Sequence, residues 1–186
     1  HGADAAKMLR ECVRLAREEQ RVVVFVEPIA LYPMRDLHDA KDSGWMQIYP
    51  APDERIALGE VGVTGEGPLA IVTYGNGHYL SQQAAKILKE KGIQTRIIDM
   101  RWLSPLPEEA IINAIKGAKK VLVVDECRQS GNVSEAVMTL LSEQSNLPNA
   151  RLAAEDSFIA TGPAYAVTMP SCESIVQAAE KLWGAK

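Results

Sequence analysis

Hydrophobic positions at the start of the chain first follow a helical period and then form an unbroken run. Apolar residues recur at intervals of three and four along residues 5–16, which predicts an amphipathic helix with Asp4 near its positive end. Residues 22–26 read Val-Val-Val-Phe-Val, which is typical of a strand covered on both faces. No sheet precedes this strand in the sequence. We therefore expect the tail of a missing domain, in a chain that starts at His-Gly-Ala and reads as an excised piece.

Residues 29–67 have no sustained period and contain many prolines and glycines. So long a stretch without regular structure is unusual inside a compact domain and predicts a linker or a functional crossing. We place the first part with its crossing segment at residues 1–50, a linker at 51–67 and a complete domain at 68–186. Residues 3–26 have no sheet of their own, so we expect them to be disordered, docked onto that domain or paired between chains.

From residue 68 onward, apolar runs alternate with segments of helical period. The runs predict strands at residues 69–73, 95–99, 121–124 and 151–154. The first helix begins near Tyr79 and is stopped by Gly92, and the second is opened by Pro105 and Pro107. A third helix follows the Gly131-Asn132 turn, and Ser171 caps a fourth. This alternation predicts an α/β fold of three layers, with a mostly parallel sheet between helices.

Composition narrows the possible partners and the compartment. The net charge is −4, aromatic residues make up only 5%, and Lys and Arg do not cluster, so we expect no nucleic-acid partner. The apolar runs are far too short to span a membrane, and the N-terminus lacks a signal-peptide pattern. Three cysteines without CxxC spacing fit a reduced compartment, either the cytoplasm or a matrix-like one.

The segment Tyr74-Gly75-Asn76-Gly77-His78 is the first candidate site, because it joins a strand to a helix. Two glycines allow a tight turn, and the N–H groups of the following helix could hold a phosphate there. However, the segment matches neither GxGxxG nor a P-loop. We favour a structural turn, and we interpret His78 as a helix-entry residue more readily than as a base.

Two further strand ends carry chemically active side chains. Asp125-Glu126-Cys127-Arg128 could form a reactive site, but a nucleophilic Cys127 needs a neighbouring cation, and we favour interface ion pairs or caps for nearby loops. Arg101 could clamp a carboxylate or a phosphate, although we prefer a role in anchoring its loop through backbone carbonyls. The three histidines are far apart in sequence, so we expect no metal site.

Several motifs in this order resemble one enzyme family. The stretch 25–32, Phe-Val-Glu-Pro-Ile-Ala-Leu-Tyr, is similar to the EP-x-x-LY segment of the beta subunit of thiamine-diphosphate-dependent 2-oxo acid dehydrogenases, and residues 3–9 resemble its DA-x-x-LL helix. Residues 71–75 resemble its TYG strand end, and 98–106 resemble its IDLRTLSPLD segment. Val121 to Glu126, with Gly131 and Glu135, resembles its LVVVEE…GG-x-x-E pattern. Pro107, Cys127 and Asn132 depart from the family pattern without changing the expected fold.

The resemblance implies the end of a pyrimidine-binding domain, a linker and a transketolase-like C-terminal domain. In that family, the diphosphate of the cofactor and the magnesium belong to the alpha part, and the glutamate that activates the cofactor's aminopyrimidine lies in the earlier part of the pyrimidine-binding domain. We therefore assign no catalytic, cofactor-binding or metal-binding residue, and we expect no cofactor on this chain. The implied partners are the alpha part, a second beta part and the dihydrolipoyl acyltransferase. The implied role is assembly and docking within an oxidative decarboxylase.

Two alternatives stay open. The chain could be a non-catalytic α/β interaction module, which is compatible with the first reading of the isolated chain. It could also be the same region of a transketolase or a deoxyxylulose-phosphate synthase, although the Glu27-Pro28 and Leu31-Tyr32 pairs argue against that.

Overall fold

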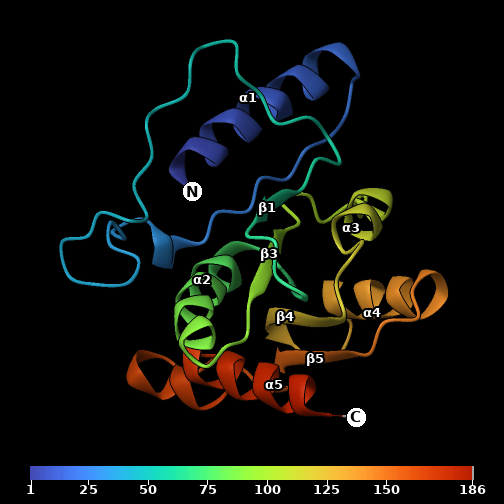
Figure 1. The fold of residues 1–186 in the computed structure, drawn as a ribbon. Helices are drawn as coiled ribbons and strands as arrows, with labels where there is room; N and C mark the ends of the chain where they lie inside the picture. The colour runs from blue at the N-terminus through green and yellow to red at the C-terminus, as the bar shows by residue number, and fades with distance from the viewer. Residues whose placement is uncertain (186) are drawn as a thin grey trace. The chain divides into compact units, whose positions relative to one another are not determined.

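The apolar runs beyond residue 68 lie side by side in one sheet (Figure 1). The computed structural model describes residues 1–185, which divide into one unit of residues 1–60 and a second from Val61 onward. The sheet belongs to the second unit and has the order β1-β3-β2-β4-β5, with β1 antiparallel to β3 and every other pair parallel. Its strands are β1 (Gly62–Thr64), β2 (Leu69–Thr73), β3 (Thr95–Asp99), β4 (Lys120–Arg128) and β5 (Asn149–Ala154).

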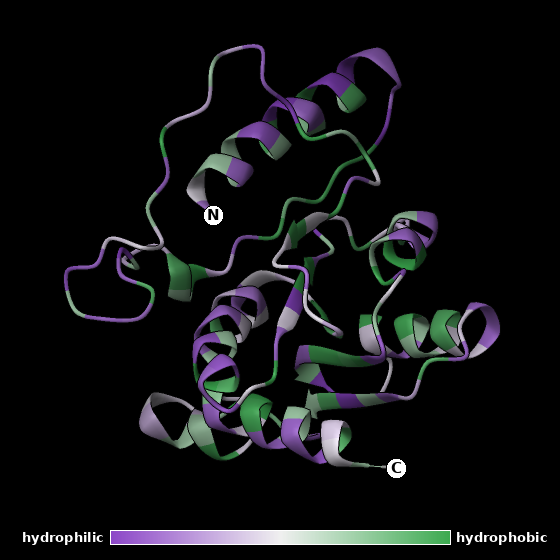
Figure 2. Cartoon of the chain, viewed as in Figure 1, coloured by the Kyte–Doolittle hydropathy of each residue, from purple (hydrophilic) through white to green (hydrophobic). Residues whose placement is uncertain are grey.

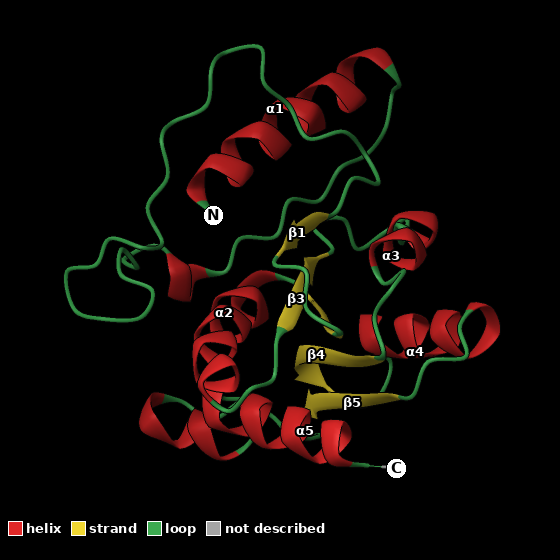
Figure 3. Ribbon diagram, viewed as in Figure 1, coloured by secondary structure: helices red, strands yellow, loops and turns green. Residues whose placement is uncertain are grey.

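Helices cover both faces of this sheet (Figure 3). Because side chains alternate along a strand, Leu69 and Ile71 of β2 face a core shared with α2 (Gly75–Glu90) and α5 (Cys172–Gly184). Ala70 and Val72 face the opposite core, which α3 (Glu108–Ala114) and α4 (Val133–Gln144) complete. Every residue of β2 is buried, as expected of a central parallel strand. The predicted three-layer α/β fold is confirmed.

Most helix ends of the second unit fall where the sequence signals them. Gly92 follows α2 at a φ of +80°, and Pro107 is the residue before α3. The side chain of Asn132 accepts from the N–H of Val133 at the start of α4. Ser171 forms a reciprocal capping box with Ser174 at the start of α5. Helix ends are local events, which is why the sequence predicts them well.

Two predicted boundaries are wrong by four residues, and two elements were not predicted. Helix α2 begins at Gly75 and not near Tyr79, because the glycines fit the first turn. Strand β4 continues to Arg128, beyond the predicted end at residue 124, since its partner β5 runs alongside. Strand β1 lies inside the expected linker, and its three residues are too few to show a period. A short 3-10 helix at Gly162–Val167 was also not expected.

The first unit is built around one helix, α1 (Gly2–Glu18), where the sequence predicts it, so the alternative of disorder is wrong for this helix. The predicted strand at residues 22–26 is absent, because this segment has no strand to pair with in its unit. It appears in Figure 2 as a hydrophobic stretch between α1 and the 3-10 turn Ile29–Leu31. Val22, Val24 and Val26 are 98%, 83% and 74% exposed.

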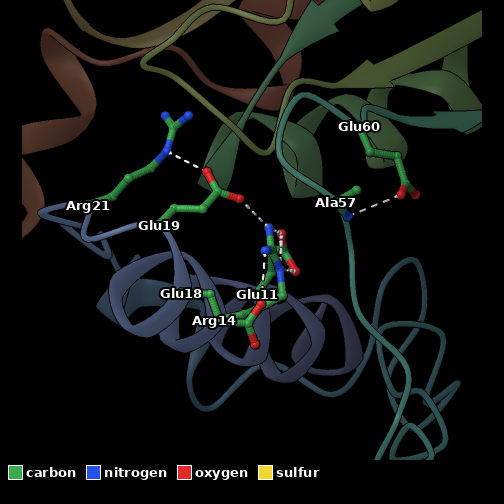
Figure 4. A network of polar contacts seen from close by, with 7 residues as sticks. All are labelled: Glu11, Arg14, Glu18, Glu19, Arg21, Ala57 and Glu60. Atoms are coloured by element: carbon green, nitrogen blue, oxygen red, sulfur yellow. Dashed lines mark hydrogen bonds and ion pairs between the residues drawn. The ribbon is translucent and has the colours of Figure 1, made fainter.

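A charged network at the end of α1 fixes the backbone there (Figure 4). Arg14 pairs with the buried Glu11 at 2.6 Å and with Glu19 at 2.9 Å, and Glu19 also pairs with Arg21 at 2.9 Å. The hydrogen bond from Arg14 holds the pKa of Glu19 below its ordinary value. Arg10, earlier in the helix, donates to the backbone carbonyls of residues 50, 51 and 54. These contacts keep residues 50–54 against α1.

Candidate functional site

The sequence-predicted candidates gather at one edge of the sheet. Tyr74 follows β2, Arg101 lies just beyond β3, and Asp125 and Glu126 belong to the last residues of β4. Since β3, β2 and β4 are adjacent and parallel, their carboxyl ends meet at this edge. The helices that follow β2 and β4 cover opposite faces, so β2 and β4 border a topological switch point. Open α/β sheets usually bind their ligands at such a point.

Asp125 is the centre of the hydrogen bonds at this edge. Its side chain is buried, and Oδ1 accepts from the Tyr74 hydroxyl at 2.7 Å and from the Cys127 N–H at 3.0 Å. Its Oδ2 accepts from the backbone N–H of Ser134 at 3.0 Å, in the first turn of α4. A buried carboxylate with three donors is well compensated, and one of those donors makes it a helix cap.

Tyr74 donates to Asp125 and is not available as a base. Burial raises the pKa of the Tyr74 phenol far above its ordinary value, and the hydrogen bond to Asp125 raises it further. The phenol therefore stays protonated throughout the physiological range. The Cys127 sulfur lies 3.6 Å from the same hydroxyl oxygen and is exposed.

Glu126 occupies the position where a phosphate could sit. Its Oε1 accepts from the backbone N–H of Asn76 at 3.3 Å, in the first turn of α2. Burial raises the pKa of Glu126, and the Asn76 N–H opposes this shift because it favours the charged form. Two consecutive residues of β4 thus cap two helices on opposite faces of the sheet. This leaves the first turns of α2 and α4 filled by the chain's own carboxylates.

The two glycines of the turn are required by close packing. Gly75 has a φ of +54°, and a Cβ there would lie 3.2 Å from Oε1 of Glu126. A Cβ at Gly77 would lie only 2.3 Å from the Thr73 hydroxyl, which is closer than real atoms approach. The glycines therefore let α2 begin directly over the end of β2. They do not form an open phosphate cradle.

His78 and Arg101 meet at the end of β3. The buried His78 places Nδ1 3.5 Å from Oδ2 of Asp99, and its Nε2 lies 2.9 Å from the side-chain nitrogen of Gln82. The backbone N–H of Arg101 donates to Oδ1 of Asp99 at 3.3 Å. Arg101 adopts a φ of +59°, and its guanidinium lies against the backbone of Gly62 in β1. Asp99 thus joins the two candidates through one carboxylate.

Arg128 has a different role from the other candidates. Its Nε donates to the carbonyl of Ser130 at 3.0 Å, and its own carbonyl accepts from the Asn132 side chain at 3.2 Å. Ser130 in turn binds Asp156, beyond β5, through its N–H at 2.9 Å and its hydroxyl at 2.5 Å. Arg128 therefore orders the loop after β4. Its guanidinium donates to the carbonyl of Ser130 and not to Cys127.

Sequence reasoning missed three residues that complete this edge. Asp99 accepts from Arg101, Ser134 donates to Asp125, and Thr73 determines the glycine at 77. Only Asp99 carries a signal in the sequence, as an acidic residue at the end of an apolar run. Among residues 1–185, no group of three or more His, Cys, Asp and Glu side chains has an arrangement that could hold a metal ion. Within the same residues, no helix is long and apolar enough to cross a membrane.

Comparison with known proteins identifies the family. The transketolase C-terminal domain matches residues 59–175. The chain belongs to this family. It is also 28% identical to the pyruvate dehydrogenase E1 component subunit beta of Bacillus subtilis, over 96% of this chain and 52% of that protein. The 2-oxoisovalerate dehydrogenase subunit beta of the same organism is 36% identical over 58% of this chain and 34% of its own length.

A solved structure agrees with these matches. The beta subunit in a structure described as a split gene transketolase, inactive beta4 tetramer, superposes with a TM-score of 0.63 and 27% identity, over 71% of this chain and 45% of that one. The two Bacillus subtilis matches confirm the resemblance to beta subunits of 2-oxo acid dehydrogenases. The chain spans about half the length of the curated relatives it matches.

Proposed function

We propose that this chain is the C-terminal portion of the E1 component of a 2-oxo acid dehydrogenase complex, serving assembly and acyltransferase docking. The observation that carries this proposal is the match to a beta subunit over 96% of the chain, which extends well beyond the domain at residues 59–175. In the whole enzyme, a 2-oxo acid is decarboxylated and its acyl group passes to a lipoyl arm. Cytoplasmic location is proposed for a bacterial protein, and the mitochondrial matrix for a eukaryotic one.

The proposal divides the chain by role. Residues 1–50 are the end of a pyrimidine-binding domain with its crossing segment, and residues from 68 form the transketolase-like domain. The segment 51–67 between them, proposed as the linker, also supplies β1 to the sheet of the second unit. Its partners are an alpha part, a second beta part and the dihydrolipoyl acyltransferase.

Thiamine diphosphate and magnesium belong, in this proposal, to the parts of the enzyme outside this chain. The residues at the switch point do not fit them, because Glu126 and Asp125 already accept from the N–H groups in the first turns of α2 and α4. A diphosphate placed there would meet two carboxylates. The polar residues of this edge instead tie helices and loops to the sheet, as a scaffold for partners requires.

The cofactor proposal is tested by isothermal titration calorimetry of the purified chain with thiamine diphosphate and Mg²⁺. We expect no measurable binding and no lipoyl-dependent decarboxylation of pyruvate or a branched-chain 2-oxo acid by the chain alone. Activity should appear only when the alpha part and the unmatched part of a beta subunit are supplied. Tight magnesium-dependent binding, or turnover by the isolated chain, would overturn the proposal.

A transketolase beta part is the second candidate, favoured by the similarity to the split gene transketolase structure. The two functions differ in the fate of the carbon unit held by the cofactor. Assembled with the missing parts, a dehydrogenase reduces a lipoyl acceptor, whereas a transketolase transfers a two-carbon ketol unit to an aldose phosphate. Ketol transfer without lipoyl reduction would establish the second candidate in place of the first.

A further inference from the structure

We draw no further inference here: the strongest candidate, the exposed apolar loop between β5 and α5 around Phe158, Ile159 and Val167, carries nothing because nothing in the structure shows what covers it.

Discussion

At the scale of single residues, the glycine-rich turn changes meaning once its neighbours are known. A Tyr-Gly-x-Gly sequence after a strand suggests an anion site, yet Glu126 already accepts from the turn and Thr73 fills the space beside Gly77. The turn therefore permits close packing. Its glycines let the backbone of α2 approach the end of β2 more closely than any side chain would allow.

Gly77→Ala should lower the free energy of unfolding by about 1–3 kcal/mol, because its Cβ would meet the Thr73 hydroxyl in a buried site. Urea unfolding measures the loss. Gly184→Ala is the matched control, since a Cβ there meets nothing within 4 Å and the position is helical. The double variant with Thr73→Ala should recover part of the loss, because the clashing oxygen is gone. Equal effects at 77 and 184 would show that the close contact does not matter.

Glu126→Gln should change how stability depends on pH. The folded-state pKa of Glu126 is raised by burial, so the folded chain binds more protons than the unfolded one between about pH 4.3 and the folded-state value. Its contribution to stability therefore falls as pH rises through that window, and glutamine removes this fall. Urea unfolding from pH 4 to pH 8 measures this effect. The free energy of unfolding of the variant should rise relative to that of the parent toward neutral pH.

Asp156→Asn is the control, because its effect on stability should depend on pH with the opposite sign. Hydrogen bonds from Ser130 lower the pKa of Asp156, so its stabilising contribution is present above the unfolded-state value and is lost as pH falls through the folded-state one. This variant should lose most relative to the parent near neutral pH. If the difference in free energy of unfolding between variant and parent changed with pH in the same direction for both variants, the two pKa directions would be contradicted.

At the scale of elements, charged side chains on the strands hold the ends of helices. Arg96 of β3 donates to the carbonyls of Ala114 and Lys116 at the end of α3, both at 2.8 Å. Lys120, at the first residue of β4, donates to three carbonyls at the end of α5. Cations here compensate the negative helix end and the carbonyls that lack partners within the helix. At the opposite edge of the sheet, Asp125 and Glu126 accept hydrogen bonds from the N–H groups at the starts of α4 and α2.

Lys120→Met should therefore destabilise the attachment of α5. We expect the free energy of unfolding to fall by about 1–2 kcal/mol, because charge-assisted hydrogen bonds to the Leu182 and Trp183 carbonyls are lost. Lys91→Met, which removes an exposed pair with Glu180 elsewhere on α5, is the matched control and should cost at most about 0.5 kcal/mol. Chemical denaturation compares the two, and a larger loss for Lys91→Met would refute the capping role.

At the scale of the whole molecule, the two units differ in how completely they bury their apolar residues. The second unit has two cores, one on each face of its sheet. The first unit, about a third of the chain, holds most of the exposed large apolar side chains of residues 1–185, among them Ile29, Ile48 and Tyr49. A domain that completes its own core does not leave such a surface. The first unit is therefore where we expect association.

The sequence by itself determined most elements of the second unit, though not β1 or the 3-10 helix at Gly162–Val167, and it determined the family. Runs such as 69–73 and caps such as Ser171 act through neighbours in the chain, so their signals are local and readable. The motifs that resemble a beta subunit also lie in short segments, and the comparisons bear them out.

Only the tertiary structure decided strand order, the partners of Asp125 and Glu126, and the state of residues 22–26. Asp125 and Tyr74 lie 51 positions apart, and their hydrogen bond exists because β2 and β4 are adjacent. Residues 22–26 read as a buried strand, yet they form none because the segment has no strand to pair with in its unit, and Val22, Val24 and Val26 are exposed. Propensity is a property of the segment, whereas pairing and burial depend on what lies beside it.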